Sequence, residues 1–300
     1  MAEDGGMPRE RWSGPELLSQ LQRFEAALRV AGLRETTVQT YVGRSETFVR
    51  WLIGEYTPRG PNTQIEEAGK AREASLGPAM LEDLSTGMAR EQIARVLGDY
   101  AAVTGYDAAL RTLLEASGGH ADMSRQTDRV AVLEWLRAWG CRHLRRADTA
   151  RTADALHEWW VVWEAKLPHP DAAITSLGAA EMLVVEQAYD ALASAPAAGR
   201  TLKDREVDVM FGDTAAAKTL FAIRPQAFPP WDEPIRLAFG WWGGGAAYVE
   251  FLHLAATTLE GLARRLDVSV AQLPQILGRP DSSAAKIVDE FLWIKITRGL

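Results

Sequence analysis

The sequence predicts an all-α protein, or one that is mostly helical, and three observations support this fold class. Apolar residues recur at the spacing of one helix face over most of the 300 residues. Period-2 alternation is confined to a short stretch, Val207–Phe211. Glycine and proline clusters such as Gly118-Gly119, Leu167–Pro170, Pro196–Gly199 and Gly243–Gly245 separate the helical segments.

The N-terminal part divides into a flexible tail, a helix pair and a linker. Residues 1–13 form the tail. A helical pattern begins near Pro15, and Gly32 is expected to end the first helix. The second helix completes a small helical module over residues 14–57. Residues 58–78 are polar and rich in Gly and Pro, which is typical of a linker.

Residues 79–300 are expected to form one large helical domain. The helical period and the separators within it place the helices at residues 89–103, 107–116, 127–140, 152–165, 179–194, 214–223, 233–239, 245–265 and 282–295. In the last segment we expect Lys286 and Asp289 to pair at the surface.

Composition excludes several classes of protein. The single cysteine, Cys141, rules out a disulfide scaffold, and the five histidines show no metal-ligand spacing, so we expect neither a metal nor a cofactor. No apolar run is long enough for a membrane span, and no secretory signal is visible, so we expect a cytoplasmic protein. The net charge of −7 disfavours a protein that coats nucleic acid non-specifically. The chain also contains 11 tryptophans, which is an unusually high number.

The segment Phe24–Pro58 carries the pattern Gly32-Leu33, Thr37-Val38, Tyr41, then Phe48 and Trp51-Leu52. It resembles the SAM-like core-binding module at the front of tyrosine recombinases. That resemblance implies a helical module that holds DNA. The rest of the chain does not follow the recombinase pattern, because no tyrosine lies near the C-terminus to act as nucleophile. A small helical cap is the alternative.

A second motif lies in Val209–Phe239, where a glycine turn opens a helix and a Pro-rich turn then delivers Asp232. This segment resembles the helix-hairpin-helix, Gly-Pro-Asp (HhH-GPD) core of DNA glycosylases. Gly212 matches the second hairpin glycine, Ala216 the small residue of the helix, and Phe228–Asp232 the aspartate turn. Met210 replaces the first hairpin glycine, so we expect a different bend or a weaker grip on phosphate.

The resemblance implies a DNA glycosylase with Asp232 as its catalytic carboxylate. Thr214 occupies the position of the Schiff-base lysine of bifunctional relatives, so the enzyme should be monofunctional and leave an abasic site. Lys218, one turn further on, is either a fallback nucleophile or a phosphate contact. Physical chemistry supports the same roles, because a helix opened by Gly212 can bind phosphate and a fixed carboxylate can stabilise a cationic sugar. A plain N-cap role for Asp232 is the alternative.

Further candidates are basic and aromatic. The expected DNA-phosphate contacts are Gly212, Thr214, Lys218, Arg224, Arg236, Arg142, Arg145 and Arg146. The expected pocket for a flipped base or a sugar comprises Trp231, Phe228, Trp241, Trp242, Trp159 and Trp163. Structural pairing of the arginines and core packing of the tryptophans are the alternatives.

The whole pattern also resembles prokaryotic anti-phage glycosylases that attack modified bases. That resemblance implies base excision from double-stranded phage DNA, with α-glucosylated hydroxymethylcytosine as the candidate base. Two alternatives stay open: a non-catalytic DNA-binding or adaptor protein on the same scaffold, and a helical protein without a nucleic-acid role. Oligomeric state is not predicted.

Overall fold

The computed structural model describes residues 14–32, 38, 42, 45, 76–146, 148–202 and 205–298. The chain divides into two compact units, Met1–Ala68 and Gly69–Leu300. In the first unit, α1 (Gly14–Val30) ends as expected, because Gly32 adopts a left-handed φ of +74° and donates its N–H to the Arg29 carbonyl. The predicted second helix of this unit lies outside the described residues, apart from isolated positions.

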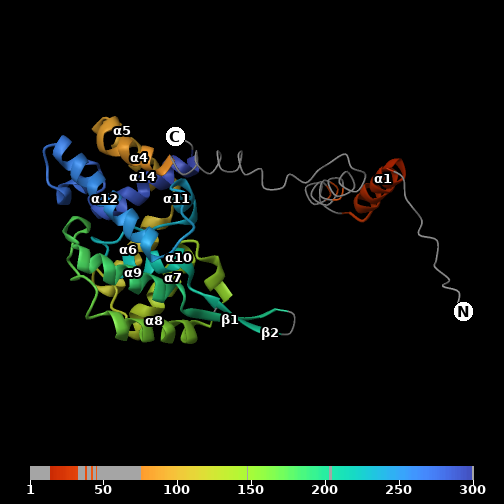
Figure 1. The fold of residues 1–300 in the computed structure, drawn as a ribbon, viewed down its shortest axis with the longest axis horizontal. Helices are drawn as coiled ribbons and strands as arrows, with labels where there is room; N and C mark the ends of the chain where they lie inside the picture. The colour runs from red at the N-terminus through yellow and green to blue at the C-terminus, as the bar shows by residue number, and fades with distance from the viewer. Residues whose placement is uncertain are drawn as a thin grey trace, which may run out of the picture. The chain divides into compact units, whose positions relative to one another are not determined.

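The second unit is mostly helical, as the sequence predicts (Figure 1). Three of the expected separators, Gly118-Gly119, Leu167–Pro170 and Gly243-Gly244, lie in connections between its helices. In chain order its helical elements are α4 (Leu76–Glu82), η1 (Asp83–Gly87), α5 (Arg90–Val103), α6 (Tyr106–Ser117), α7 (Gln126–Ala138), η2 (Arg142–Arg146), α8 (Thr149–Trp163), η3 (Ile174–Ser176), α9 (Ala179–Ala193), α10 (Gly212–Ile223), α11 (Glu233–Ala238), α12 (Gly245–Arg265), η4 (Val270–Gln272), α13 (Leu273–Ile276) and α14 (Ala284–Arg298).

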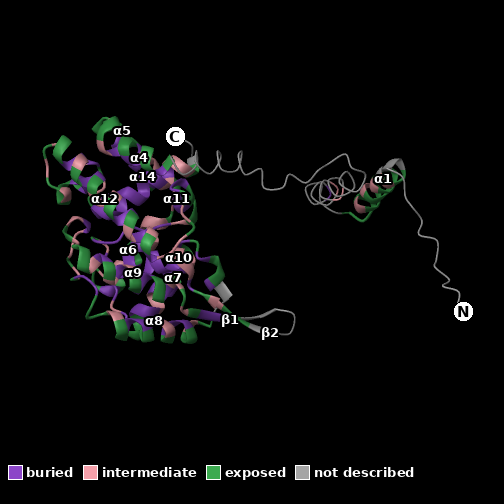
Figure 2. Ribbon diagram, in the orientation of Figure 1, coloured by how far each residue is buried: buried purple, intermediate pink, exposed green. Residues whose placement is uncertain are grey.

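Helix α10 is the central element of this unit. Every residue from Ala215 to Ile223 is buried, and the helix packs against α7 and α9. The alanines at its start permit this close approach, since they carry little side-chain volume. Buried residues run through the interior of the helical body and exposed residues face outward (Figure 2). The core therefore surrounds the helix that precedes the aspartate turn.

A two-stranded antiparallel sheet is the departure from an all-helical unit. Strand β1 (Pro196–Leu202) pairs with β2 (Arg205–Met210), and the hairpin extends away from the helices (Figure 1). The period-2 stretch at 207–211 coincides with β2, so that indication is confirmed. The interpretation of Pro196–Gly199 as a mere separator is wrong, because these residues form the first half of β1.

Two further expectations need correction. Residues 76–78, placed in the linker on account of Gly77 and Pro78, are the start of α4. The side chains of Lys286 and Asp289 do not pair at the surface, because both residues are buried on α14. No helix within the described residues is long and apolar enough to cross a membrane.

Candidate functional site

The hairpin glycine initiates α10 with a left-handed backbone. Gly212 has a φ of +70°, a conformation that costs glycine little and other residues more. The preceding residue, Phe211, is fixed from two sides. Its N–H donates to the Ala195 carbonyl at 3.0 Å, and its carbonyl lies 2.8 Å from Nε2 of His143. The β-hairpin and η2 thus hold the entry to α10, and Met210, the last residue of β2, is exposed.

The aspartate turn is built on buried side chains. Phe228, Pro229, Pro230 and Trp231 are all buried, and the Tyr248 hydroxyl donates to the Pro229 carbonyl at 2.9 Å. Asp232 then occupies the N-cap position of α11, but its carboxylate accepts no capping hydrogen bond. The N-cap alternative therefore describes the backbone of Asp232 and leaves its side chain available for another role.

That side chain forms an ion pair with Lys218. Nζ of Lys218 lies 2.7 Å from Oδ1 of Asp232, and the side chains are 3% and 21% exposed, respectively. Nζ also donates to the Trp139 carbonyl at 2.7 Å. Burial lowers the pKa of Lys218, but the acidic groups around it, first of all the adjacent Asp232 carboxylate, together hold that pKa above its ordinary value. The Lys218 side chain is thus a protonated ammonium group, and its charged partner is the Asp232 carboxylate.

This position corrects the prediction that Lys218 contacts DNA phosphate, because a buried ammonium paired with a carboxylate presents no charge to the surface. Arg224 is corrected for a similar reason. It is buried, and its guanidinium donates to the carbonyls of Pro168 at 2.7 Å and Ile223 at 2.8 Å. Burial also lowers the pKa of Arg224. Arg224 therefore has a structural role through backbone carbonyls, and not through the acidic partner that the sequence suggested.

An open cavity of about 490 Å³ lies where the end of the β-hairpin, η2 and the start of α11 meet. Its lining comes from η2 and the residues before it, from the end of β2, from the first turn of α10 and from α11. The lining residues are Gly140, Cys141, Arg142, His143, Val209, Met210, Phe211, Gly212, Asp213, Thr214, Glu233 and Arg236.

Four predicted phosphate-binding residues line this cavity: Gly212, Thr214, Arg142 and Arg236. Arg142 is exposed, whereas Arg236 is buried and donates to Oγ1 of Thr214 at 3.1 Å and to the Trp231 carbonyl at 3.0 Å. The side chains of Arg145 and Arg146 lie outside the description. The cavity therefore combines the exposed Arg142 with the N-terminus of α10, whose backbone N–H groups can bind an anion, and its lining also includes the carboxylates of Asp213 and Glu233.

The predicted aromatic pocket divides by burial. Phe228, Trp231 and Trp159 are core residues that offer no surface to a ligand, which corrects the pocket prediction for these three. Trp159, for example, donates its indole N–H to the Ala188 carbonyl at 2.8 Å. Trp163 and Trp241 are partly buried, and Trp241 stacks on Phe239.

Trp242 differs from the others because it is 79% exposed on a rigid turn between α11 and α12. The N–H of Gly244 donates to Oδ1 of Asp213 at 2.7 Å, and the N–H of Gly245 donates to Oδ1 of Asp190 at 2.6 Å. Asp213 also lines the cavity. The backbone that follows the exposed Trp242 is thus anchored to Asp213, a residue that also forms part of the cavity wall.

We expect Gly243→Ala to destabilise this turn. Gly243 has a φ of +141°, and an added Cβ would lie 2.4 Å from Oδ2 of Asp213. The free energy of unfolding should fall by about 1–3 kcal/mol, measured by urea denaturation. Gly98→Ala is the matched control, because a Cβ at this helical glycine meets no atom within 4 Å. Equal stability of Gly243→Ala and wild type would contradict a strained, fixed turn.

Two contributors to the site were not predicted from the sequence. Asp213 holds the Trp242 turn, and His143 ties η2 to the hairpin. Position alone marked them, since Asp213 follows Gly212 and His143 lies between Arg142 and the pair Arg145-Arg146. The described residues contain no group of three or more His, Cys, Asp or Glu side chains that could hold a metal ion.

Comparisons of the chain with protein-family models, curated proteins and solved structures gave no match.

Proposed function

We propose that this protein is a monofunctional DNA glycosylase. It hydrolyses the N-glycosidic bond of a base flipped out of double-stranded DNA and leaves an abasic site. The proposed substrate is a modified base, with α-glucosylated hydroxymethylcytosine of phage DNA as the first candidate on the strength of the sequence resemblance. Defence against phage is the corresponding biological role.

One observation supports this function above the others. The cavity joins the N-terminus of α10, Arg142 and the start of α11, and the partly exposed Asp232 carboxylate is the residue immediately before that helix. Backbone N–H groups and an arginine suit a phosphate, while a fixed carboxylate suits the sugar next to it. Glycosylase chemistry requires a contact to phosphate and a carboxylate beside the sugar. Adjoining residues would therefore supply both.

In the proposed reaction the bond from the sugar C1′ to the base nitrogen breaks, and the base leaves with the bonding electrons. Positive charge develops on the deoxyribose, as in the hydrolysis of O-glycosides, and the Asp232 carboxylate stabilises it. Water then adds to C1′, and the base takes up a proton. Lys218 holds Oδ1 of Asp232 in place, which leaves Oδ2 for the sugar or for the attacking water.

The monofunctional assignment has two supports. Thr214 offers no amine at the position of the Schiff-base lysine. The amine nearest to Asp232, that of Lys218, has a raised pKa and is kept as an ammonium, which has no lone pair for attack on C1′.

The test is to incubate the purified protein with duplexes containing unmodified, hydroxymethylated or glucosylated cytosine, and to score alkali-labile sites. We expect alkali-labile sites in one modified duplex. Strand scission without alkali, or trapping of a covalent adduct by borohydride, would contradict a monofunctional enzyme. Intact DNA in every arm would overturn the proposed activity on these substrates.

A non-catalytic DNA-binding or adaptor protein is the second candidate, and a specific observation favours it. Lys218 neutralises Asp232, and the cavity lining within the described residues contains no tryptophan. Such a protein would bind the same duplexes and release no base. Binding measured in parallel with base release therefore separates the two functions.

Trp242 is expected to contribute to DNA binding by stacking. Removing an exposed ring that stacks on a base costs about 1–3 kcal/mol, so Trp242→Ala should weaken binding by roughly 5- to 150-fold. Trp242→Phe should retain most of the affinity, because it keeps an aromatic face. Fluorescence anisotropy with a labelled duplex measures both. Equal DNA affinity of the wild type and Trp242→Ala would show that no base stacks on Trp242.

A further inference from the structure

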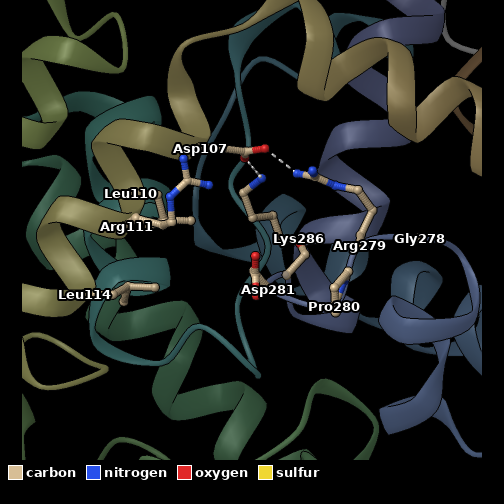
Figure 3. A pocket seen from close by; sticks show the side chains of 10 residues that line it. Asp107, Leu110, Arg111, Leu114, Gly278, Arg279, Pro280, Asp281 and Lys286 are labelled. Atoms are coloured by element: carbon tan, nitrogen blue, oxygen red, sulfur yellow. Dashed lines mark hydrogen bonds and ion pairs between the residues drawn. The ribbon is translucent and has the colours of Figure 1, made fainter.

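A second, smaller cavity lies between α6, the loop that joins α13 to α14, and the first turn of α14 (Figure 3). It holds about 130 Å³ and shares no lining residue with the cavity at the start of α10. Since one water molecule needs about 10–15 Å³ of such space, the smaller cavity can hold a molecule of several non-hydrogen atoms. Its occupant must therefore be small.

The polar wall of this cavity is a set of ion pairs. Asp107 of α6 accepts from Nη2 of Arg279 and, at 3.0 Å, from Nζ of Lys286. Glu290 of α14, which is fully buried, accepts from Lys286 and from Nε and Nη2 of Arg279 at 2.8 Å. Burial raises the pKa of Asp107, but Lys286 and Arg279 together hold it below its ordinary value. Two carboxylates and two cations thus balance one another in this wall.

Two further charged residues line the cavity without such a partner. Arg111 lies one turn after Asp107 on α6, Asp281 lies in the loop before α14, and both are exposed. Within the described residues the side chain of neither makes a hydrogen bond or an ion pair, and no dashed line joins either to another residue in Figure 3. One unpaired cation and one unpaired carboxylate therefore border the same small space, farther apart than an ion pair allows.

The arginines of the lining also have unused donors. Figure 3 shows the guanidinium groups of Arg111 and Arg279 on either side of the Asp107 carboxylate. Arg279 uses Nε and Nη2 for its two carboxylate partners, and its Nη1 makes no hydrogen bond within the described part of the chain. A guanidinium presents its N–H groups as a planar fork that matches a carboxylate. The free donors of both arginines thus suit a carboxylate ligand.

The rest of the lining includes an apolar surface. Leu110 and Leu114 line the cavity together with Arg111, since residues three and four apart share one face of α6. Pro280 adds a further apolar side chain from the loop. The cavity thus offers a cationic group, an anionic group and a short apolar wall.

We propose that this cavity binds a small zwitterion, namely an α-amino acid with a short aliphatic side chain. Its carboxylate accepts from Arg111 and from Nη1 of Arg279, and its ammonium donates to Asp281. Its side chain contacts Leu110 and Leu114. A ligand with one charge of each sign matches the two unpaired residues, whereas a simple anion leaves Asp281 without a partner.

Titration calorimetry of the full chain with L-valine tests this site. We expect saturable binding with a dissociation constant below about 1 mM. Isovalerate lacks the ammonium of valine, and isobutylamine lacks its carboxylate, so each should bind at least about tenfold more weakly. Absence of valine binding, or equal affinity for valine and either analogue, would overturn the proposal.

Two variants test the assigned contacts. Arg111→Gln and Asp281→Asn should each weaken valine binding by about 10- to 100-fold, since each removes a hydrogen bond between charged groups. Isovalerate should bind Asp281→Asn no more weakly than it binds the wild type, because it has no ammonium to lose a partner. Wild-type affinity for valine in either variant would contradict the proposed site.

The controls are Arg95→Gln on α5 and Asp171→Asn in the loop before η3. Both residues are exposed and lie outside the lining of the cavity, so valine affinity should not change. Urea denaturation of all four variants checks that each is folded. Valine binding is measured without DNA, so its result and the result of the base-release assay are independent of each other.

Discussion

Replacing Asp232 by asparagine should reduce base release by about 10²- to 10⁴-fold. Asparagine keeps the shape of the side chain but carries no negative charge, so it neither stabilises the cationic sugar nor activates water. Single-turnover kinetics on the duplex that gives alkali-labile sites would measure the effect. DNA affinity should change little, because the carboxylate is proposed to act on the transition state.

Asp171→Asn is the matched control, because it removes the same negative charge from a residue in an exposed loop. A stability measurement accompanies both variants, because Asp232→Asn also breaks the ion pair with Lys218. A folded Asp232→Asn protein that releases base at the wild-type rate would refute the assignment of Asp232.

Replacing Glu290 by alanine should destabilise the fold by about 3–5 kcal/mol. Glu290 is fully buried and accepts from both Arg279 and Lys286, so its loss leaves the buried Lys286 and the partly buried Arg279 with Asp107 as their remaining charged partner. Urea denaturation followed by tryptophan fluorescence measures the change. The loss should be larger than that of any surface ion pair in this protein.

Asp208→Ala provides the comparison, because Asp208 and Arg151 form an ion pair with side chains that are 48% and 47% exposed. Its cost should stay below about 1 kcal/mol. The double variant Lys286→Met, Glu290→Leu should recover part of the stability lost in Glu290→Ala, since apolar residues need no partner. Equal costs for Glu290→Ala and Asp208→Ala would show that the ion pairs of Glu290 with Arg279 and Lys286 do not stabilise the fold.

Helix positions in the second unit follow closely from sequence because they depend on local periodicity. The expected helix at 89–103 is observed as Arg90–Val103, and that at 245–265 as Gly245–Arg265. Strand β1 was not predicted, since its partner β2 is what makes Pro196–Leu202 a strand. Helix α4 was missed because Gly77 and Pro78 suggested a linker, whereas Gly77 provides space for the ring of Phe239.

The site shows the same division between local and distant information. Gly212 and the aspartate turn follow from a short motif, and in the structure Gly212 begins α10 as that motif predicts. The ion pair of Lys218 with Asp232 joins two helices, so spacing along the chain could not predict it. Burial of Trp159, Trp231 and Phe228 likewise depends on packing, which composition does not determine.

The buried Cys141 has a practical consequence for spectroscopy. It is the single cysteine of the chain, it is 2% exposed, and burial raises the pKa of its thiol to about 11. Thiol-reactive probes need the thiolate, so Cys141 should stay unmodified at neutral pH. A cysteine introduced on the exposed turn, as in Trp242→Cys, can therefore take a spin label or a fluorophore in the native background. Such a probe would report how the turn responds when a duplex arrives.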